Sequence, residues 1–433
     1  MGAETFWIVT GQAIGVIGGL VGVRVLTGIL PPETYGEVAL GMTVALLGQQ
    51  LLFGPLGAAV TRFFAPAREE HELPSFLGAC RVLFRKASMA AVALGTAIAL
   101  GLFLLGQTEF LLVALIAVLL SIATGGNSIL SAIQGAARQR MIVAWHQGLA
   151  QWLRFSLAVI AVWLVGSFSA AVLLGYLASI CVVLFSQFFF LQRLIKPQIG
   201  AGRQREEADS SEYASRIWSF GWPFAAWGLF TWCQLASDRW AIQHFASPSA
   251  VGHYQVLYQL GYAPILLASG AVNQLFSPIL YSRAGDASDK TRLGGVLRLN
   301  RMIVLAIALL TVAGGLLAQS TYSMILRIFV DQRYRDVGNL LPLMVVAGGV
   351  RATAETASLA PTISNKTVSL LRPRVCMAIT GTTLNIVAAW QWGVAGVVFA
   401  LIAQQGLYLA WMLVIATRIR IADGSDQMLD TTD

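Results

Sequence analysis

Six ionisable side chains lie inside long apolar segments of the sequence, where charge is costly. They are Arg24, Arg154, Asp238, Arg239, Arg351 and Glu355. An arginine at the centre of a lipid bilayer costs about 2.5–3.5 kcal/mol even on the most lenient insertion scale. Each of these side chains must therefore face protein or water. Four arginines against two carboxylates favour a cationic interior, and a planar guanidinium binds two phosphate oxygens at once.

Arg154 lies near the middle of its apolar segment. Gln147 and Gln151 precede it by seven and three residues, so all three share one helical face. We expect this face to line a water-filled cavity, with an arginine bonded to carbonyl groups of a neighbouring helix as the alternative. Asn127, Ser131 and Gln134 form a similar stripe. That stripe suits either a cavity or helix packing.

The other charged residues have alternatives of their own. Arg24 lies toward the outer end of the first apolar segment, where it faces a cavity or reaches the interface. Arg351 and Glu355 are four residues apart and can pair along a helix, as a functional or a structural ion pair. Asp238 and Arg239 are adjacent and point about 100° apart on a helix, so they need not pair with each other.

Catalytic motifs are absent from the sequence. It has no Walker A loop, no HExxH, no GxSxG and no metal-binding spacing of cysteine and histidine. No loop is long enough to hold a catalytic domain. We therefore expect no enzyme activity, no catalytic residue, no metal and no cofactor.

The composition indicates that most of the protein surface is surrounded by lipid. Of the 433 residues, 57% are hydrophobic and 12% are charged, whereas a soluble domain has about 25% charged residues. Too few polar side chains remain to cover a surface in water, so we predict a membrane protein. The net charge of +8 comes from short loops between apolar segments. Anionic lipid headgroups are therefore the expected partner, and not nucleic acid.

Apolar runs long enough to cross a bilayer, which needs about 20 residues per helix, predict an all-α polytopic protein with twelve spans. The runs are 6–30, 37–61, 87–105, 110–134, 143–165, 169–192, 217–245, 251–280, 297–318, 338–360, 375–390 and 394–417. They predict a first six-helix bundle, a cytoplasmic linker, a second six-helix bundle and a cytoplasmic tail, at residues 1–196, 197–216, 217–420 and 421–433.

The distribution of basic residues predicts the orientation. With the N-terminus inside, the cytoplasmic segments hold 22 lysines and arginines and the outer segments hold 3. The positive-inside rule then places both termini in the cytoplasm. One missed span would scramble this alternation, so the asymmetry also supports the count of twelve.

Two sets of motifs resemble a known family. In the first half, Arg24 precedes Pro32-x-x-Tyr35-Gly36, and the next apolar run ends at Arg62. In the second half, Asp238-Arg239 precede Val251-Gly252-x-Tyr254. The chain resembles the polysaccharide transporter family, the Wzx-like flippases, of the multidrug/oligosaccharidyl-lipid/polysaccharide exporter superfamily. The segment Thr27–Pro31 departs from the tight form of the family's turn.

The resemblance implies two six-helix bundles around a central cavity and transport by alternating access. It implies a bacterial cytoplasmic membrane protein that moves a polyprenyl-diphosphate-linked oligosaccharide, an O-antigen, capsule or exopolysaccharide unit, to the outer leaflet. Other polysaccharide assembly proteins are expected partners. On this reading the cations that meet diphosphate or acidic sugar are Arg24, Arg62, Arg154 and Arg239, with Arg351 added from its depth. Gln147 and Gln151 would meet sugar hydroxyls, and Asp238 or Glu355 would take a coupling proton. Arg62 is equally explained as a cytoplasmic anchor.

Three other functions compete with the flippase. A multidrug exporter of the same fold would want an acidic cavity, yet only Asp238 and Glu355 are available against four arginines. A membrane enzyme acting on polyprenyl lipids would need a large loop or paired carboxylates. A scaffold for polysaccharide assembly would not need polar residues in the middle of its spans.

Overall fold

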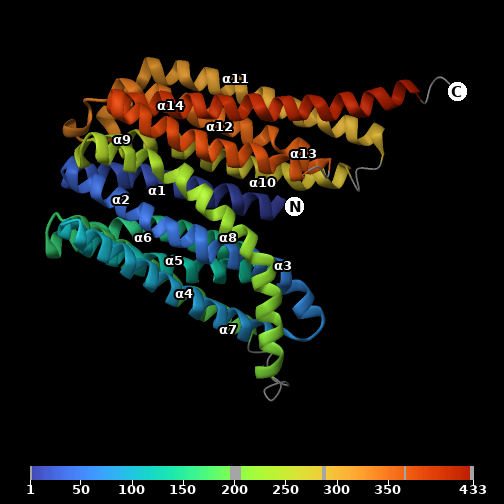
Figure 1. The fold of residues 1–433 in the computed structure, drawn as a ribbon, viewed down its shortest axis with the longest axis horizontal. Helices are drawn as coiled ribbons and strands as arrows, with labels where there is room; N and C mark the ends of the chain where they lie inside the picture. Colours follow the sequence, from blue (N-terminus) through green and yellow to red (C-terminus); the bar gives the residue numbers. More distant parts are fainter. Residues whose placement is uncertain (1, 196–205, 285–288, 365–366, 430–433) are drawn as a thin grey trace. The chain divides into compact units, whose positions relative to one another are not determined.

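The computed structural model describes residues 2–195, 206–284, 289–364 and 367–429. The chain forms two compact units, Met1–Ala236 and Ser237–Asp433, which are described separately. Almost all described residues are helical, and no strand occurs among them (Figure 1). The protein is an all-α polytopic membrane protein, as predicted.

The helices of the first unit begin at the N-terminus and end within α8. They are α1 (Gly2–Ile29), α2 (Pro32–Gly48), the π-helical η1 (Gln49–Phe53), α3 (Gly54–Glu69), α4 (Leu73–Leu104), the short η2 (Thr108–Phe110), α5 (Leu111–Ala136), α6 (Arg140–Val165), α7 (Ser169–Ile195) and the first part of α8 (Glu206–Phe245).

The second unit begins inside α8 and contains the remaining helices. They are α9 (Pro248–Leu257), the π-helical η3 (Tyr258–Tyr262), α10 (Ala263–Ala284), α11 (Lys290–Phe329), the short η4 (Gln332–Tyr334) and η5 (Gly338–Leu340), α12 (Leu341–Ala357), α13 (Leu359–Ile363), η6 (Thr367–Leu370) and α14 (Leu371–Leu429).

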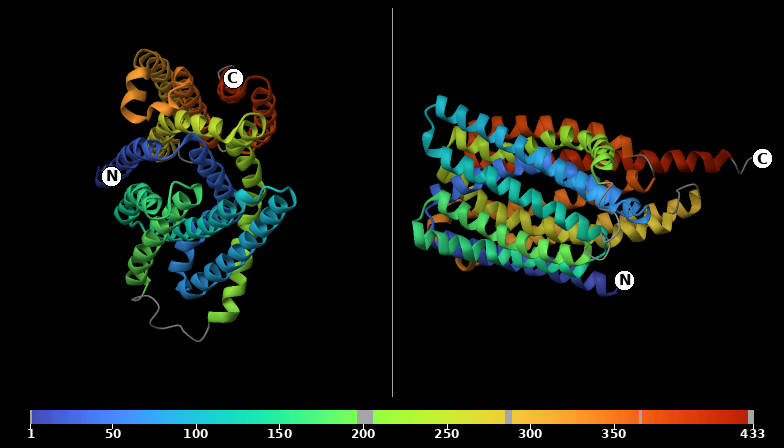
Figure 2. Two further views of the ribbon diagram at one scale, coloured as in Figure 1. Left: turned by 90° about the vertical axis from the view of Figure 1, so that its left-hand side faces the viewer. Right: turned by 90° about the horizontal axis from the view of Figure 1, so that it is seen from below.

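Each predicted apolar run coincides with helix in the structure (Figure 2). Within the described residues, eight helical segments are long and apolar enough to cross a membrane. One of them, Leu371–Ile419, contains two predicted runs, because α14 breaks at Gly393, whose φ is 56°. Glycine tolerates this backbone conformation, and the break falls between runs 375–390 and 394–417. The total of twelve spans and the central cavity stay predictions.

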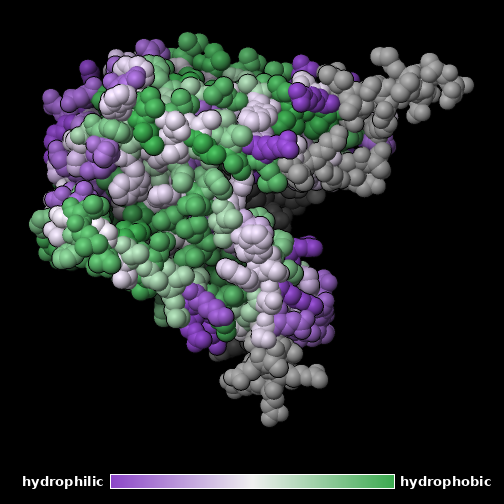
Figure 3. All heavy atoms as spheres, in the orientation of Figure 1, coloured by the Kyte–Doolittle hydropathy of each residue, from purple (hydrophilic) through white to green (hydrophobic). Residues whose placement is uncertain are grey.

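The outer faces of the helices are apolar, as a lipid environment requires. Trp163 is 84% exposed, Phe185 78% and Leu104 74%. Figure 3 shows apolar side chains gathered over the helices of both units. Side chains of this size at such exposure would be unfavourable in water, so these faces are the surfaces that contact lipid.

The predicted linker, 197–216, lies partly outside the described residues, which resume at Glu206 in the first turn of α8. The two compact units divide further along, after Ala236. Hydrogen bonds attach α8 to the first unit near both ends of residues 206–236. The Tyr213 hydroxyl donates to the Glu72 carboxylate at 2.5 Å, and the Trp232 indole donates to the Thr43 carbonyl at 2.7 Å. Burial, with the Glu72 carboxylate, raises the pKa of Tyr213, so its phenol stays a donor.

Glycines let α1 and α6 approach closely. A Cβ at Gly11 would lie 3.4 Å from the Ala144 Cβ, and one at Gly22 would overlap the Phe155 ring. The pairs 11 with 144 and 22 with 155 show that the two helices run in the same direction. Small residues are the usual means by which membrane helices pack. The parallel direction is the one expected for a first and a fifth span.

Replacing Gly22 by valine should separate these helices, because the new side chain meets the Phe155 ring. We expect a destabilisation of about 1–3 kcal/mol, typical of overpacking. The midpoint of thermal unfolding in detergent measures it. The control is Gly19→Val on the same helix, where a Cβ meets nothing within 4 Å. Equal midpoints for the two variants would show that the contact does not hold α1 against α6.

Candidate functional site

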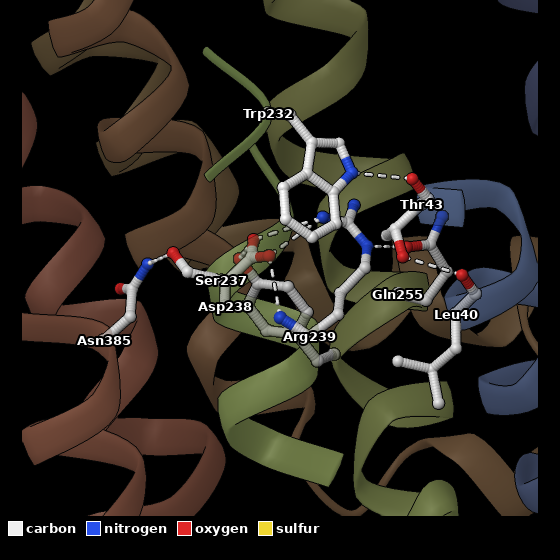
Figure 4. Close-up of polar contacts among 9 residues, drawn as sticks. Leu40, Thr43, Trp232, Ser237, Asp238, Arg239, Gln255 and Asn385 are labelled. Atoms are coloured by element: carbon white, nitrogen blue, oxygen red, sulfur yellow. Dashed lines mark hydrogen bonds and ion pairs between the residues drawn. The ribbon is translucent and has the colours of Figure 1, made fainter. Parts of the chain in front are cut away.

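The second unit contains a buried polar cluster at the junction of α8 and α9 (Figure 4). Asp238 is 3% exposed and Arg239 is 7% exposed. One terminal nitrogen of Arg239 lies 3.1 and 3.2 Å from the two Asp238 carboxylate oxygens, and its Nε donates to the Gln255 Oε1 at 2.9 Å. The Tyr254 hydroxyl donates to Asp238 at 2.6 Å. Although their Cβ atoms point in different directions, the two adjacent residues do pair.

This pairing satisfies both charges where water is scarce. The Asp238 carboxylate accepts from the Arg239 guanidinium, from the Arg239 main-chain N–H at 2.7 Å and from Tyr254. A buried charge is tolerated when it is paired and its remaining lone pairs are bonded. The cluster is therefore electrically balanced, and Arg239 is already engaged.

Three tyrosines extend the cluster along α9 and η3. Tyr254, Tyr258 and Tyr262 recur every four residues, so they share one helical face. The Arg239 guanidinium carbon lies 4.4 Å from the centre of the Tyr258 ring, within cation–π range. The Tyr258 and Tyr262 rings are 5.0 Å apart. Sequence reasoning missed this row, although its four-residue spacing was a visible signal.

A second ion pair lies on α12. The Arg351 guanidinium is 2.6 Å from the Glu355 carboxylate, and the side chains are 22% and 30% exposed. Arg351 also lies 3.4 Å from the Gln405 Oε1 and 5.6 Å from the centre of the Tyr408 ring, both on α14. The predicted pairing along the helix is present. Asp238 and Glu355, the two carboxylates singled out from the sequence, thus each have an arginine partner.

Arg154 in the first unit is in a different state. Its guanidinium carbon lies 4.1 Å from the centre of the Tyr176 ring of α7. Its Nε is buried and has no hydrogen-bond partner among the described residues. No carboxylate pairs with it there. The cavity expected beside Arg154 and its alternative, an arginine bonded to carbonyl groups of a neighbouring helix, both stay predictions.

The other predicted residues of the first unit lie on three helices. Arg24 on α1 and Arg62 on α3 are exposed, and neither forms an ion pair within the described part of the chain. Gln147 is exposed, whereas Gln151 is half-buried and has its Cγ 3.9 Å from a Cβ built at Gly15 of α1. Among the candidate site residues, the arginines without an ion-pair partner thus lie in the first unit, and the paired arginines lie in the second.

The stripe on α5 is mostly helix packing. Gln134 donates to the Gln187 carbonyl at 3.3 Å, and Gln187 donates to the Ser131 hydroxyl at 3.1 Å. Gln187 of α7 was not singled out from the sequence, because one glutamine in an apolar run gives no periodic signal. Three amide oxygens of this region, those of Asn127, Gln134 and Gln187, are buried without a partner among the described residues.

Comparison with known proteins places the chain in a family. A model described as polysaccharide biosynthesis protein matches residues 1–281, more than half of the chain. The chain belongs to this family. No curated protein matches it.

Solved structures similar to this family member are transporters. The lipid II flippase MurJ in an inward closed conformation has a TM-score of 0.67 at 13% identity, covering 96% of this chain and 88% of its own. An inward-facing multidrug resistance transporter of the MATE family has a TM-score of 0.64 at 13% identity and 99% coverage of each chain. A transporter of the same MOP superfamily from Pyrococcus furiosus, with a binding pocket of reverse polarity, has a TM-score of 0.60 at 14% identity, covering 97% and 96%.

These similarities establish the fold. The family assignment predicted from the Arg24 and Asp238 motifs is confirmed, and the chain has the fold of the MATE and MurJ transporters. That fold is shared by proteins of different cargo. The chemistry of the cargo must therefore be argued from the side chains of this chain.

Removing one partner of the buried pair tests its structural role. Asp238→Ala leaves the Arg239 charge without its carboxylate, and we expect a loss of about 3–5 kcal/mol in unfolding free energy. The double variant Asp238→Ala, Arg239→Met should recover most of that loss. Chemical unfolding in detergent measures both, with the exposed Glu109→Ala as control. A double variant as unstable as the single one would contradict the pairing.

Proposed function

We propose that this protein is a flippase for a polyprenyl-diphosphate-linked oligosaccharide, such as an O-antigen, capsule or exopolysaccharide unit, in the bacterial cytoplasmic membrane. The observation that supports it best is Arg154, a cation within an apolar span whose Nε is buried and unbonded and which has no carboxylate partner in the described residues. An arginine with an unbonded Nε and no carboxylate partner can bind an anion. A diphosphate offers the oxygens that a guanidinium binds best.

The distribution of charge favours an anionic cargo over a cationic drug. In the first unit Arg24, Arg62 and Arg154 have no carboxylate partner among the described residues. In the second unit the carboxylates of Asp238 and Glu355 are occupied by arginine. A cation would find no free carboxylate in these pairs. The multidrug alternative is the weaker one for this reason, and Gln147 and Gln151 would meet sugar hydroxyls beside Arg154.

The two ion pairs suggest how transport is coupled. When Asp238 is ionised, Arg239 is neutralised within its own cluster. Protonation of Asp238 would remove that compensation and leave Arg239 available to an anion. The same argument applies to Arg351 and Glu355. Asp238 and Glu355 are thus the proposed coupling carboxylates, and Arg239 and Arg351 bind cargo only in the protonated state.

A transporter is favoured over the other two alternatives. The solved structures with this fold are transporters and flippases. A membrane enzyme would need a pair of carboxylates acting together, whereas Asp238 and Glu355 are each bonded to an arginine. We propose no catalytic residue and no cofactor. We propose other polysaccharide assembly proteins as partners of this protein.

The first experiment is a deletion strain in which the lipid-linked saccharide is analysed by leaflet. Intact saccharide lipid should accumulate on the cytoplasmic face, with loss of surface polymer. A shorter or unmodified glycan on that lipid would instead mean that the protein acts before transport, and would support the enzyme or scaffold.

Arg154→Ala should abolish export while the protein still inserts and accumulates. The guanidinium binds two phosphate oxygens, and the loss of each charge-assisted hydrogen bond lowers transport about tenfold or more, which together bring export close to zero. Arg154→Lys should retain part of the activity, since it keeps the charge and loses the planar fork. Export at the wild-type level in Arg154→Ala would remove this cation from the mechanism.

The proposed orientation, with both termini cytoplasmic, is tested by reporter fusions. A fusion after residue 205 should report the cytoplasm, and one at Ser247 should report the periplasm, because 22 basic residues fall on one side and 3 on the other. The opposite result at either site would contradict twelve spans.

A further inference from the structure

The first unit contains an apolar groove between α4, α8 and the η1–α3 segment. Its volume is about 680 Å³. Leucines of η1, α3 and α4 and small residues of α4 and α8 line it, including Leu52, Leu83, Ala90 and Ala225. Lys86 of α4 is the single charged residue among its lining residues.

The groove has a structural origin. Most of the α8 segment that lines it lies between the two hydrogen bonds that attach α8 to the first unit, Tyr213 with Glu72 and Trp232 with Thr43. On this face α8 contributes the small residues Ala214, Gly221 and Ala225 beside Ile217 and Trp218, and a Cβ at Gly221 would lie 3.4 Å from the Pro55 carbonyl oxygen. Fixed ends with these small residues between them leave a space that no described side chain fills.

The lining changes character along the groove. Ser211, Ser215 and Lys86 are its polar members and belong to the parts of α8 and α4 predicted to lie at the cytoplasmic side. Deeper positions such as Ala90, Gly221 and Ala225 are apolar. The ligand that matches this order is an amphiphile, with an anionic group at the cytoplasmic mouth and a hydrocarbon chain below it. Arg81 and Arg85 of α4, both exposed, add positive charge near the mouth.

We propose that this groove binds the polyprenyl chain of the lipid-linked cargo, with Lys86 on its phosphate end. The inference rests on the proposed function and extends it to the lipid part of the cargo. The arginines of the first unit then act on the diphosphate and sugar, while the groove holds the chain.

A single-chain lipid fits the groove better than a phospholipid. Along α8 the lining extends from Ser211 to Ala225, which at 1.5 Å per residue is about 21 Å. That is about two thirds of the hydrocarbon thickness of a bilayer, about 30 Å. Burial alone gives little preference, because lipid tails are as apolar as leucine. Selection must come from the cationic mouth above a single channel, which suits one phosphate on one chain, whereas a phospholipid has two chains on one phosphate.

The test uses the full-length protein in nanodiscs and a polyprenyl phosphate with a diazirine near the end of its chain. Photolysis should label peptides of α4 and α8 in the wild type. Ala90→Phe fills the deep end of the groove and should reduce the labelling of these peptides at least about fivefold, by the loss of space that overpacking causes. Ala97→Phe is the matched control, an exposed alanine of α4 outside the lining, and should label as the wild type.

Lys86→Ala tests the phosphate end. It should weaken binding of the polyprenyl phosphate about tenfold, the factor for one charge-assisted hydrogen bond. Binding of the uncharged polyprenol should not change, which a merely structural role of Lys86 would not predict.

Three results would overturn the proposal. They are wild-type labelling in Ala90→Phe, labelling confined to other helices, and equal competition by phosphatidylglycerol, which would make the groove a general lipid site. Failure of this inference can be distinguished from failure of the proposed function. Unchanged labelling in Ala90→Phe, together with a leaflet defect in the deletion strain, would contradict the groove as a polyprenyl site and still support the flippase. A wild-type protein that moves no lipid-linked saccharide would contradict the flippase itself.

Discussion

The cost of a charge in lipid governs how both units are built. In the second unit the chain meets that cost internally, because Asp238, Tyr254 and Gln255 surround Arg239 with acceptors and an opposite charge. In the first unit it does not, because Arg154 has an aromatic ring and no carboxylate among the described residues. A protein that keeps such a cation within its span has a use for it. The electrostatic asymmetry between the units is therefore the property from which a function has to be argued.

The two units share a π-helical segment in the second predicted span of each half. In each, a helix that begins with proline contains one π-helical segment, Gln49–Phe53 in the first unit and Tyr258–Tyr262 in the second. Such segments widen one turn and often occur at functional sites. In the first unit Gln49 of that segment donates to Ser128, and in the second Tyr258 lies under Arg239. The same backbone irregularity thus serves polar packing in one unit and the ion pair in the other.

Much of the fold followed from the sequence, because each apolar run had the length of a bilayer and a break at its ends. The helix starting at Leu371 was separable into two runs by composition alone, with the break at Gly393 between them. The pairing of Arg351 with Glu355 also followed, since four residues is one helical turn. The pairing of Asp238 with Arg239 did not, because it depends on the side-chain conformation that brings the Arg239 guanidinium to the Asp238 carboxylate. The Gln187 contacts and the groove beside α8 depend on which helices are neighbours, and a single sequence does not encode that in any local pattern.

The position of Arg154 bears on how the chain enters the membrane in the first place. The most apolar 18-residue window of Met141–Val165 has a mean hydropathy of 1.6, against 2.2 for that of Ser169–Arg193, which directly follows it and supplies Tyr176. At the translocon a helix with a central arginine partitions poorly when it is alone. The connection between α6 and α7 is short and turns at Gly166, whose φ is 118°. Insertion of the two helices together, as a hairpin, would place the Tyr176 ring of the second helix over the Arg154 guanidinium of the first and lower the cost of bringing that charge into lipid.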